Sequence, residues 1–404
     1  MKNISRFIFA AILFISIFTV NVLHTYCLTE THNVWNGEAA SSFSRGNGSR
    51  KDPYIIESAC ELAYFRDCVN SGKTYKGKYI KLENDIDLCG KNWSPIGTIS
   101  LNNSNLLFKS FEGDFNGQDK IINNFIIDDN TLEAVGLFGV TGPMSNIHNL
   151  KIGDNTNICG NENVGAFTGI GLGKLCKCTS LASIVGHSMV GGIAGYCLGE
   201  INNCKSYGTI SGKDLCIGGI CGYTGNVVAN CTNNSTVISE YACKMGGITG
   251  YSDGYIINCI NYGNVSSKKG SYIGGISGVN YKDVSNCLSC ASITGDMFTA
   301  GIVGLNNGYD NCTLNSKIKN CYWNKDLYDG QGVYSSTKDI IENVCSVSSE
   351  NIKEKAFIDI LNNNVDIYNK SIKFVYMNYW EQGENLLPAI GRNEPSIIKL
   401  RNNY

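Results

Sequence analysis

Proline, histidine and an excess charge of either sign are all scarce in this chain. Of its 404 residues only 5 are Pro and 4 are His, and 33 basic residues face 35 acidic ones. The balanced charge argues against a broad surface for nucleic acid or an anionic membrane. None of the four histidines begins the H-E-x-x-H pattern that a zinc metallopeptidase requires. No catalytic, cofactor or metal site is predicted.

Glycine, by contrast, is abundant, with 46 residues. Many glycines with few prolines indicate short strands joined by tight turns rather than a disordered linker.

The N-terminus resembles an export signal. Lys2 and Arg6 precede an apolar run from Phe7 to Leu23. A basic start followed by such a run predicts a secretory signal peptide over residues 1–27, with an uncleaved anchor as the alternative. We therefore expect a secreted or cell-surface protein, which touches a membrane only through that segment if it is retained.

A short motif recurs through the middle of the chain. It consists of a hydrophobic residue followed by Gly and, two residues later, by Ile or Phe. The copies begin at Val135, Val164, Val190, Ile217, Met245, Ile273 and, with Thr-Ala in the first two positions, Thr299. Successive starts differ by 29, 26, 27, 28, 28 and 26 residues. A period in the twenties is typical of a solenoid with one supersecondary unit per coil.

A second half of the unit repeats in step with the first. Its cysteine column is Cys178, Cys204, Cys231, Cys259, Cys287 and Cys321, and Asn precedes all but the first. Six residues after each of the first five cysteines comes Ile or Val, an even offset that keeps both side chains on one face of a strand. Each coil thus supplies four apolar columns, and stacking buries them. We predict an all-β fold, a right-handed parallel β-helix with coils of about 26–29 residues.

Two rival solenoids and two chemical interpretations fit the repeat less well. The regularly spaced Leu of leucine-rich repeats and the Asp of calcium β-rolls are missing. Gly191, Gly218, Gly246 and Gly274 open no helix, as a phosphate loop would; we expect them at corners that need close backbone approach or φ > 0. A cysteine column along one side is a poor zinc tetrahedron, so we expect small buried thiols. The out-of-phase cysteines are better disulfide candidates: Cys60, Cys68, Cys89, Cys159, Cys176, Cys197, Cys216, Cys243 and Cys345.

The flanks of the repeat have a different pattern. Ser58 and Glu61 form a capping box before a helical pattern, and residues 81–88 alternate like a strand. A second helical pattern covers residues 351–362. We expect an N-terminal cap at residues 28–98, repeats at 99–325 and a C-terminal cap at 326–404, because the open ends of a solenoid need covering.

The chain resembles the GLUG-motif proteins. "VGLFG" at Val135 matches the family signature, and Phe111 to Ile127 resembles its lead-in, with Asn116 for Asp and Asp119 for His. These are exported bacterial proteins, and the motif also occurs in the N-terminal part of some IgA-cleaving metallopeptidases. The resemblance implies a right-handed β-helix of secreted or cell-surface type. It implies little about activity, and without H-E-x-x-H the peptidase activity does not carry over.

Two classes of function remain open. Many β-helices degrade polysaccharides, but the candidate groups here, Asp114, Asp128, Asp129 and His187, form no recognisable acid–base pattern. The favoured alternative is a non-catalytic, adhesin-like scaffold that binds an extracellular glycan or a cell-surface protein. Its expected ligand surface is formed by recurring tyrosines, namely Tyr207, Tyr262, Tyr223 and Tyr251.

Overall fold

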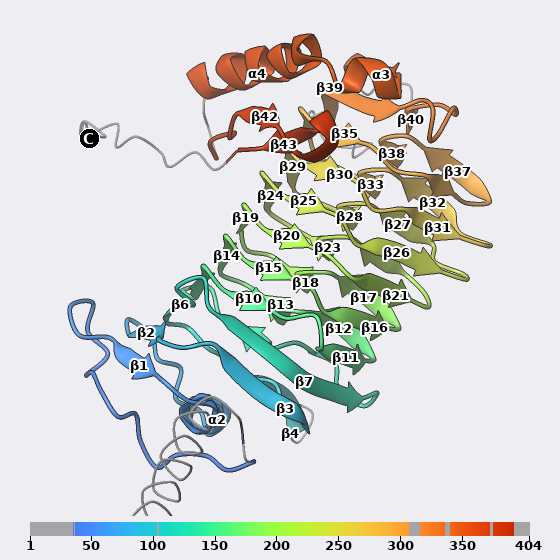
Figure 1. Cartoon of the computed structure of the whole chain (residues 1–404). Coiled ribbons are helices and arrows are strands. Elements are labelled where there is room, and N and C mark those ends of the chain that lie inside the picture. Colours follow the sequence, from blue (N-terminus) through green and yellow to red (C-terminus); the bar gives the residue numbers. More distant parts are fainter. Residues whose placement is uncertain are drawn as a thin grey trace, which may run out of the picture.

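The protein is a parallel β-solenoid of about 10 turns, whose coils stack along one axis (Figure 1). The computed structural model describes residue 35 and residues 37–102, 105–306, 316–335, 340–371 and 375–391. The predicted signal peptide lies outside these residues. No helix in the described part of the chain is long and apolar enough to span a membrane.

Each complete coil contributes a strand to five parallel ladders, numbered here in chain order. The first ladder comprises β1 (Tyr54–Ile56), β2 (Tyr79–Leu82), β6 (Asp114–Asn116), β9 (Asn146–His148), β14 (Lys174–Cys176), β19 (Ile201–Asn202), β24 (Val227–Ala229), β29 (Tyr255–Ile257), β34 (Val284–Ser285) and β39 (Lys317–Asn324). The second comprises β3 (Ile86–Asn92), β7 (Ile121–Asp129), β10 (Lys151–Ile152), β15 (Thr179–Ser180), β20 (Lys205–Ser206), β25 (Thr232–Asn233), β30 (Ile260–Asn261) and β35 (Leu288–Ser289), and it also ends on β39.

The long strand β7 also starts the third ladder, so that the first three ladders form one continuous sheet. The third ladder continues with β11 (Asn157–Gly160), β16 (Ser183–Gly186), β21 (Thr209–Gly212), β26 (Thr236–Ser239), β31 (Val265–Ser267) and β36 (Ile293–Thr294). The fourth comprises β12 (Glu162–Gly165), β17 (Ser188–Gly191), β22 (Cys216–Gly218), β27 (Lys244–Gly246), β32 (Ser271–Gly274) and β37 (Met297–Ala300). The fifth comprises β8 (Phe138–Thr141), β13 (Thr168–Gly171), β18 (Ala194–Cys197), β23 (Cys221–Thr224), β28 (Thr249–Ser252), β33 (Ser277–Asn280), β38 (Val303–Asn306) and β40 (Val333–Ser335).

The predicted repeat register is confirmed residue by residue. All seven motif starts pair in one column, from Val135 through to Thr299. The Ile/Val column pairs likewise from Ile184 to Ile293. In the coil around Cys259, the side chains of Val265, Ile273 and Ile276 are fully buried with it. The first ladder adds an inward apolar column that the sequence analysis missed: Ile147, Leu175, Ile201, Val228, Ile256, Val284 and Ile318.

The repeated glycines are required by close backbone approach rather than by positive φ. A Cβ added at Gly191, Gly218, Gly246 or Gly274 would lie 2.0–2.2 Å from the carbonyl oxygen three residues further on. Positive φ occurs instead at the asparagine column, where Asn203, Asn230, Asn258, Asn286 and Asn320 have φ of 53° to 57°. Of the two reasons expected for glycine, only the close approach applies at these four positions.

The cysteine column lies inside the solenoid, as predicted. Its six side chains are fully buried, and none of the cysteines in the described residues is disulfide-bonded, the out-of-phase candidates included. Each thiol of the column faces main-chain carbonyls; Cys259 Sγ, for example, lies 3.5 Å from the oxygen of Val228 and 3.3 Å from that of Ile257. Burial raises the pKa of Cys231 and Cys259 well above the usual thiol value. Cys231 and Cys259 therefore stay protonated, and the column fills space inside the solenoid.

Helices close both ends of the stack (Figure 1). At the N-terminal end, α2 (Ala59–Asn70) begins at Ser58, whose side chain accepts a hydrogen bond from the Glu61 N–H, as the capping box predicts. At the C-terminal end, β41 (Ile340–Val347) adds to β39, and α3 (Ser349–Ile352) and α4 (Lys355–Lys370) follow. Two short antiparallel strand pairs complete the fold. The first consists of β4 (Thr98–Asn102) and β5 (Asn105–Lys109), and the second of β42 (Trp380–Gln382) and β43 (Pro388–Ile390). A 3₁₀ turn, η1 (Glu384–Leu386), lies between β42 and β43.

The N-terminal region predicted as a cap also contributes coils. Its strands β1 and β2 pair in parallel with each other and then with β6. The predicted strand at residues 81–88 is divided between β2 and β3, with a break after Leu82.

We expect Gly246→Ala to destabilise the solenoid by about 1–3 kcal/mol, because the added methyl collides with the Thr249 carbonyl inside a packed stack. Urea unfolding followed by circular dichroism measures the change. Lys268→Ala, at an exposed position in the next coil, is the control and should stay within about 0.5 kcal/mol of wild type. Equal stability of the two variants would contradict the close approach.

Brief alkylation of the folded protein should modify the exposed cysteines Cys89, Cys243 and Cys345 and leave the cysteine column untouched. After denaturation without reductant, the column should react completely. Mass spectrometry of the peptides distinguishes the two groups. A bridge between neighbouring column members, such as Cys231 and Cys259, would show that the interior is not a stack of free thiols.

Candidate functional site

Tyrosines of the fifth ladder stack on the outside of the solenoid. Tyr196, Tyr223 and Tyr251 pair in register on β18, β23 and β28, and each is half-buried. Their ring centroids lie 4.6 and 5.3 Å apart with nearly parallel planes, and Tyr281 extends the stack at 5.3 Å with a tilt of 37°. Because each ring covers the face of the next, the ladder presents ring edges and phenol groups outward, with whole faces available only at its ends.

Charged groups border this ladder. The Tyr223 hydroxyl donates a 2.7 Å hydrogen bond to Asp253, and Lys244 Nζ lies 4.5 Å from the Tyr251 ring centroid. Burial, and then the negative charge of Asp253, raises the pKa of Tyr196. Tyr196 therefore stays neutral at physiological pH, and the ladder combines apolar ring edges with polar contacts.

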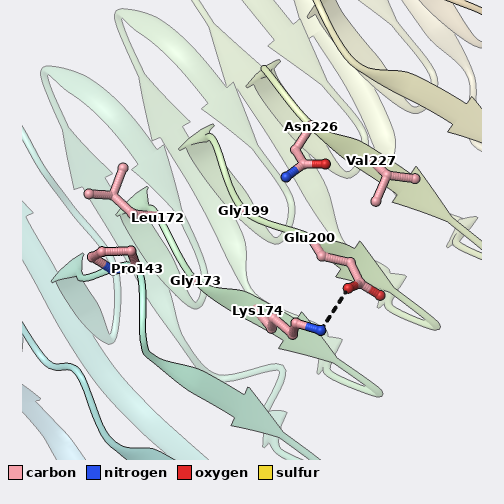
Figure 2. A pocket seen from close by; sticks show the side chains of 8 residues that line it. All are labelled: Pro143, Leu172, Gly173, Lys174, Gly199, Glu200, Asn226 and Val227. Atoms are coloured by element: carbon pink, nitrogen blue, oxygen red, sulfur yellow. Dashed lines mark ion pairs between the residues drawn. The ribbon is translucent and has the colours of Figure 1, made fainter. Parts of the chain in front are cut away.

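A groove of about 370 Å³ lies at the corner where the fifth ladder leads into the first (Figure 2). Its lining consists of Pro143, Leu172, Gly173, Lys174, Gly199, Glu200, Asn226 and Val227. Lys174 Nζ and Glu200 Oε2 form an ion pair at 3.2 Å beside it. A Cβ at Gly199 would lie 1.6 Å from the Gly173 carbonyl oxygen, so the stacked glycines keep this corner close-packed.

The groove adjoins the tyrosine ladder. Leu198, which is 41% exposed, lies between Tyr196 and the groove residue Gly199 in the sequence, and Asn226 follows Tyr223 by three residues. The ladder formed by Tyr196, Tyr223, Tyr251 and Tyr281, together with this groove, is here called the tyrosine face. It combines aromatic edges, a hydrophobic side chain, an amide and an ion pair along the solenoid axis.

Two of the four predicted tyrosines lie elsewhere, and one prediction about their exposure was wrong. Tyr223 and Tyr251 belong to the tyrosine face. Tyr262, expected to face solvent, packs against the C-terminal residues, and its hydroxyl bonds to the Pro388 carbonyl. Burial raises the pKa of Tyr262 far above its ordinary value. Tyr207 is also half-buried, and burial and then the charge of Glu384 raise its pKa.

The acid–base candidates are spread over β6, the end of β7 and a corner of the solenoid. Asp114, on β6, accepts hydrogen bonds from His148 Nε2 at 3.0 Å and from Asn146 at 2.8 Å. The second His148 nitrogen lies 2.9 Å from the amide of Asn149, so both ring nitrogens have partners. Asp128 and Asp129 lie exposed at the end of β7, and Asp129 bonds to Thr131. His187 lies at the third–fourth corner, where its carbonyl accepts from the Asp214 N–H. The structure brings His148, rather than His187, to Asp114.

No protein-family model matches the chain. It is 34% identical over 178 residues to a "Putative Gly-rich membrane protein" of Evansella cellulosilytica, a match that covers 42% of this chain and 18% of the relative. It is 29% identical over 143 residues to Halomucin of Haloquadratum walsbyi, which covers 33% of this chain and 2% of that protein. The chain thus spans less than a fifth of either curated relative.

A crystal structure of a "putative immunoglobulin A1 protease" from Bacteroides ovatus is similar in fold. It aligns with a TM-score of 0.54 and 22% identity, over 87% of this chain and 96% of that one. At this identity the likeness supports the solenoid fold alone.

We expect the contacts of Asp114 to make a pH-dependent contribution to stability. Although burial acts against it, the hydrogen bonds from His148 and Asn146 lower the Asp114 pKa below 3.8. The ionised form is therefore favoured in the folded state. Its contribution is complete above the unfolded pKa and is lost as the pH falls through the folded value. Asp114→Asn should lower the free energy of unfolding at pH 7, and the difference from wild type should shrink below about pH 3. A difference that stays constant with pH would contradict this role.

Proposed function

We propose that the protein is a secreted or cell-surface scaffold without catalytic activity, which binds a glycan chain along its tyrosine face. The observation that carries the proposal is the in-register stack Tyr196–Tyr223–Tyr251 beside a groove that contains polar and apolar groups. Sugars present both C–H faces and hydroxyl groups, and aromatic edges next to an amide and an ion pair offer contacts to both.

The geometry favours an extended ligand. The tyrosines repeat once per coil, and parallel strands are spaced about 4.8 Å apart, so that equivalent contacts recur along the axis. A linear polymer of similar units can make the same contact at several coils, and its binding strengthens with each contact. Charged side chains, those of Asp253, Lys174 and Glu200, lie among the apolar groups of the tyrosine face. This mixture suits a hydroxylated chain better than a flat hydrophobic partner.

The names of the relatives agree with a surface role. The words "membrane protein" and "Halomucin" describe two proteins that share only a fraction of their length with this chain. They support a location outside the cytoplasm, together with the predicted export signal at residues 1–27.

A glycan array with the mature protein tests the proposal. We expect selective binding that Tyr196→Ala and Tyr251→Ala each weaken by about tenfold or more, because each removes an aromatic contact at the face. Tyr241→Ala is the matched control, because Tyr241 is a 51% exposed tyrosine outside the tyrosine face. It should bind like wild type.

Two outcomes would overturn the proposal. Equal weakening by Tyr241→Ala, or none by the ladder variants, would remove the tyrosine face as the ligand site. Release of reducing or unsaturated ends from a bound polysaccharide would contradict the non-catalytic part and favour a polysaccharide-degrading enzyme.

A further inference from the structure

The C-terminal residues Val375–Gly391, here called the arm, do not only cover the end of the solenoid. They run back beside the first ladder and contact coils far from them in sequence. The arm contacts three of the left-handed asparagines between the first and second ladders, Asn203, Asn230 and Asn258. A fourth, Asn286, bonds instead to Leu361 and Asn364 of α4. These four asparagines are here called the asparagine corner. The corner amides also bond to one another, with Asn258 donating to Asn230 and Asn286 donating to Asn258 at 2.8 Å each.

The asparagine corner binds the main chain of the arm. The side-chain amide of Asn230 donates to the Tyr376 carbonyl at 2.8 Å, and its oxygen accepts from the Asn378 N–H at 2.8 Å. One coil further on, Asn258 donates to the Asn378 carbonyl at 2.9 Å. A single amide that satisfies a carbonyl and an N–H two residues apart recognises an extended backbone whatever its side chains are.

Side chains of the arm make the corner specific for this segment rather than for any extended peptide. Along it Val375, Met377 and Trp380 are buried, whereas Tyr376 and Tyr379 are about half exposed. The Trp380 indole N–H donates to Asn258 at 2.6 Å, and the Asn378 amide bonds to Asn203. The buried tryptophan is therefore an anchor of the kind that dominates peptide-binding sites.

The solenoid surface beneath the arm is adapted to it. Where the arm and α4 cover the outer positions of the first two ladders, the residues are apolar: Val227, Ala229, Ile257, Ile260 and Leu288. In the preceding coils the equivalent outer positions hold Lys174, Glu200, Asn202, Thr179 and Lys205. The outer surface thus changes from polar to apolar at the coils that the arm occupies.

We propose that the asparagine corner is a peptide-binding site whose partner, besides its own arm, is the arm of a second copy of this chain. The corner bonds to main-chain groups, to the Trp380 indole and to the Asn378 side chain. Because a second copy carries the same residues, an arm supplied in trans satisfies every contact that the resident arm makes. Exchange of identical C-terminal segments then links two copies without any new interface. This inference does not depend on the ligand of the tyrosine face.

The test uses the full chain with a protease site inserted between Ser371 and Val375. After cleavage, a fluorescent peptide of residues 375–391 is added and its incorporation is followed by polarisation. We expect saturable binding as the resident arm leaves. Trp380→Ala in the peptide should weaken it at least tenfold, whereas Tyr376→Ala, at a 54% exposed arm position, should have little effect.

The corner itself is tested with Asn230→Gly, which removes the amide and still tolerates a φ of 53°. It should weaken peptide binding at least tenfold. Asn320→Gly is the matched control, since Asn320 has the same backbone conformation and bonds to Asn343, outside the arm.

Three results would overturn the proposal: release of the arm without uptake of the peptide, equal binding by the Asn230 and Asn320 variants, or a cleaved arm that stays bound and unexchanged even when it carries Trp380→Ala.

Discussion

The register between coils is the constraint on which the rest of this structure depends. Every strand of the five ladders pairs in parallel with its equivalent in the next coil, so each position must suit the residues above and below it. The spacing along the chain reflects this. In four successive repeats the first residue of the motif and the next residue of the Ile/Val column are 20 positions apart: Val190 and Ile210, Ile217 and Val237, Met245 and Val265, and Ile273 and Ile293.

From Val164 to Thr299 the variation in repeat length is confined to one corner, whereas the first repeat is longer before Ile158. Between the Ile/Val column and the next motif start the distances are six, seven, eight, eight and six residues, from Ile184 to Val190 through to Ile293 to Thr299. This is the third–fourth corner, where His187 and Tyr241 lie. The other corners carry glycines with no room for a Cβ, asparagines in the left-handed conformation, or stacked side chains, so an inserted residue there would shift every contact that follows.

The interior could be predicted from the sequence because the repeat displays it. Columns such as Cys259 and Val265 recur at fixed intervals, and a residue type that recurs in every coil points to a shared environment. The apolar column at Ile256 was missed because it varies among Ile, Leu and Val in short strands without a motif of their own.

Contacts that occur only once could not be predicted in this way. Tyr262 has the same position in its coil as Tyr207, and nothing in either repeat indicates that Pro388, 126 residues later, covers it. The change from Lys205 to Ile260 along the second ladder was the available signal, since an outer position that turns apolar implies that something covers it.

The outside of the solenoid thus divides into two surfaces with different chemistry. On the tyrosine face, stacked rings recur along the axis beside a groove that contains an ion pair. At the asparagine corner, amides that stabilise the turns also hold the arm by its main chain. Both arise from the same property, because a residue placed once per coil becomes a row when coils stack in register.

Deletion of one complete coil tests this account most directly. Removal of Gly165–Val190 joins Val164 to Gly191, which takes the register position of Gly165, and leaves the coils that the arm contacts intact. Removal of only Gly165–Lys177 breaks the register within the coil. The account predicts that the full-coil deletion keeps the β-sheet circular dichroism spectrum and a cooperative thermal transition, and that the half-coil deletion loses both. Equal behaviour of the two deletions would contradict it.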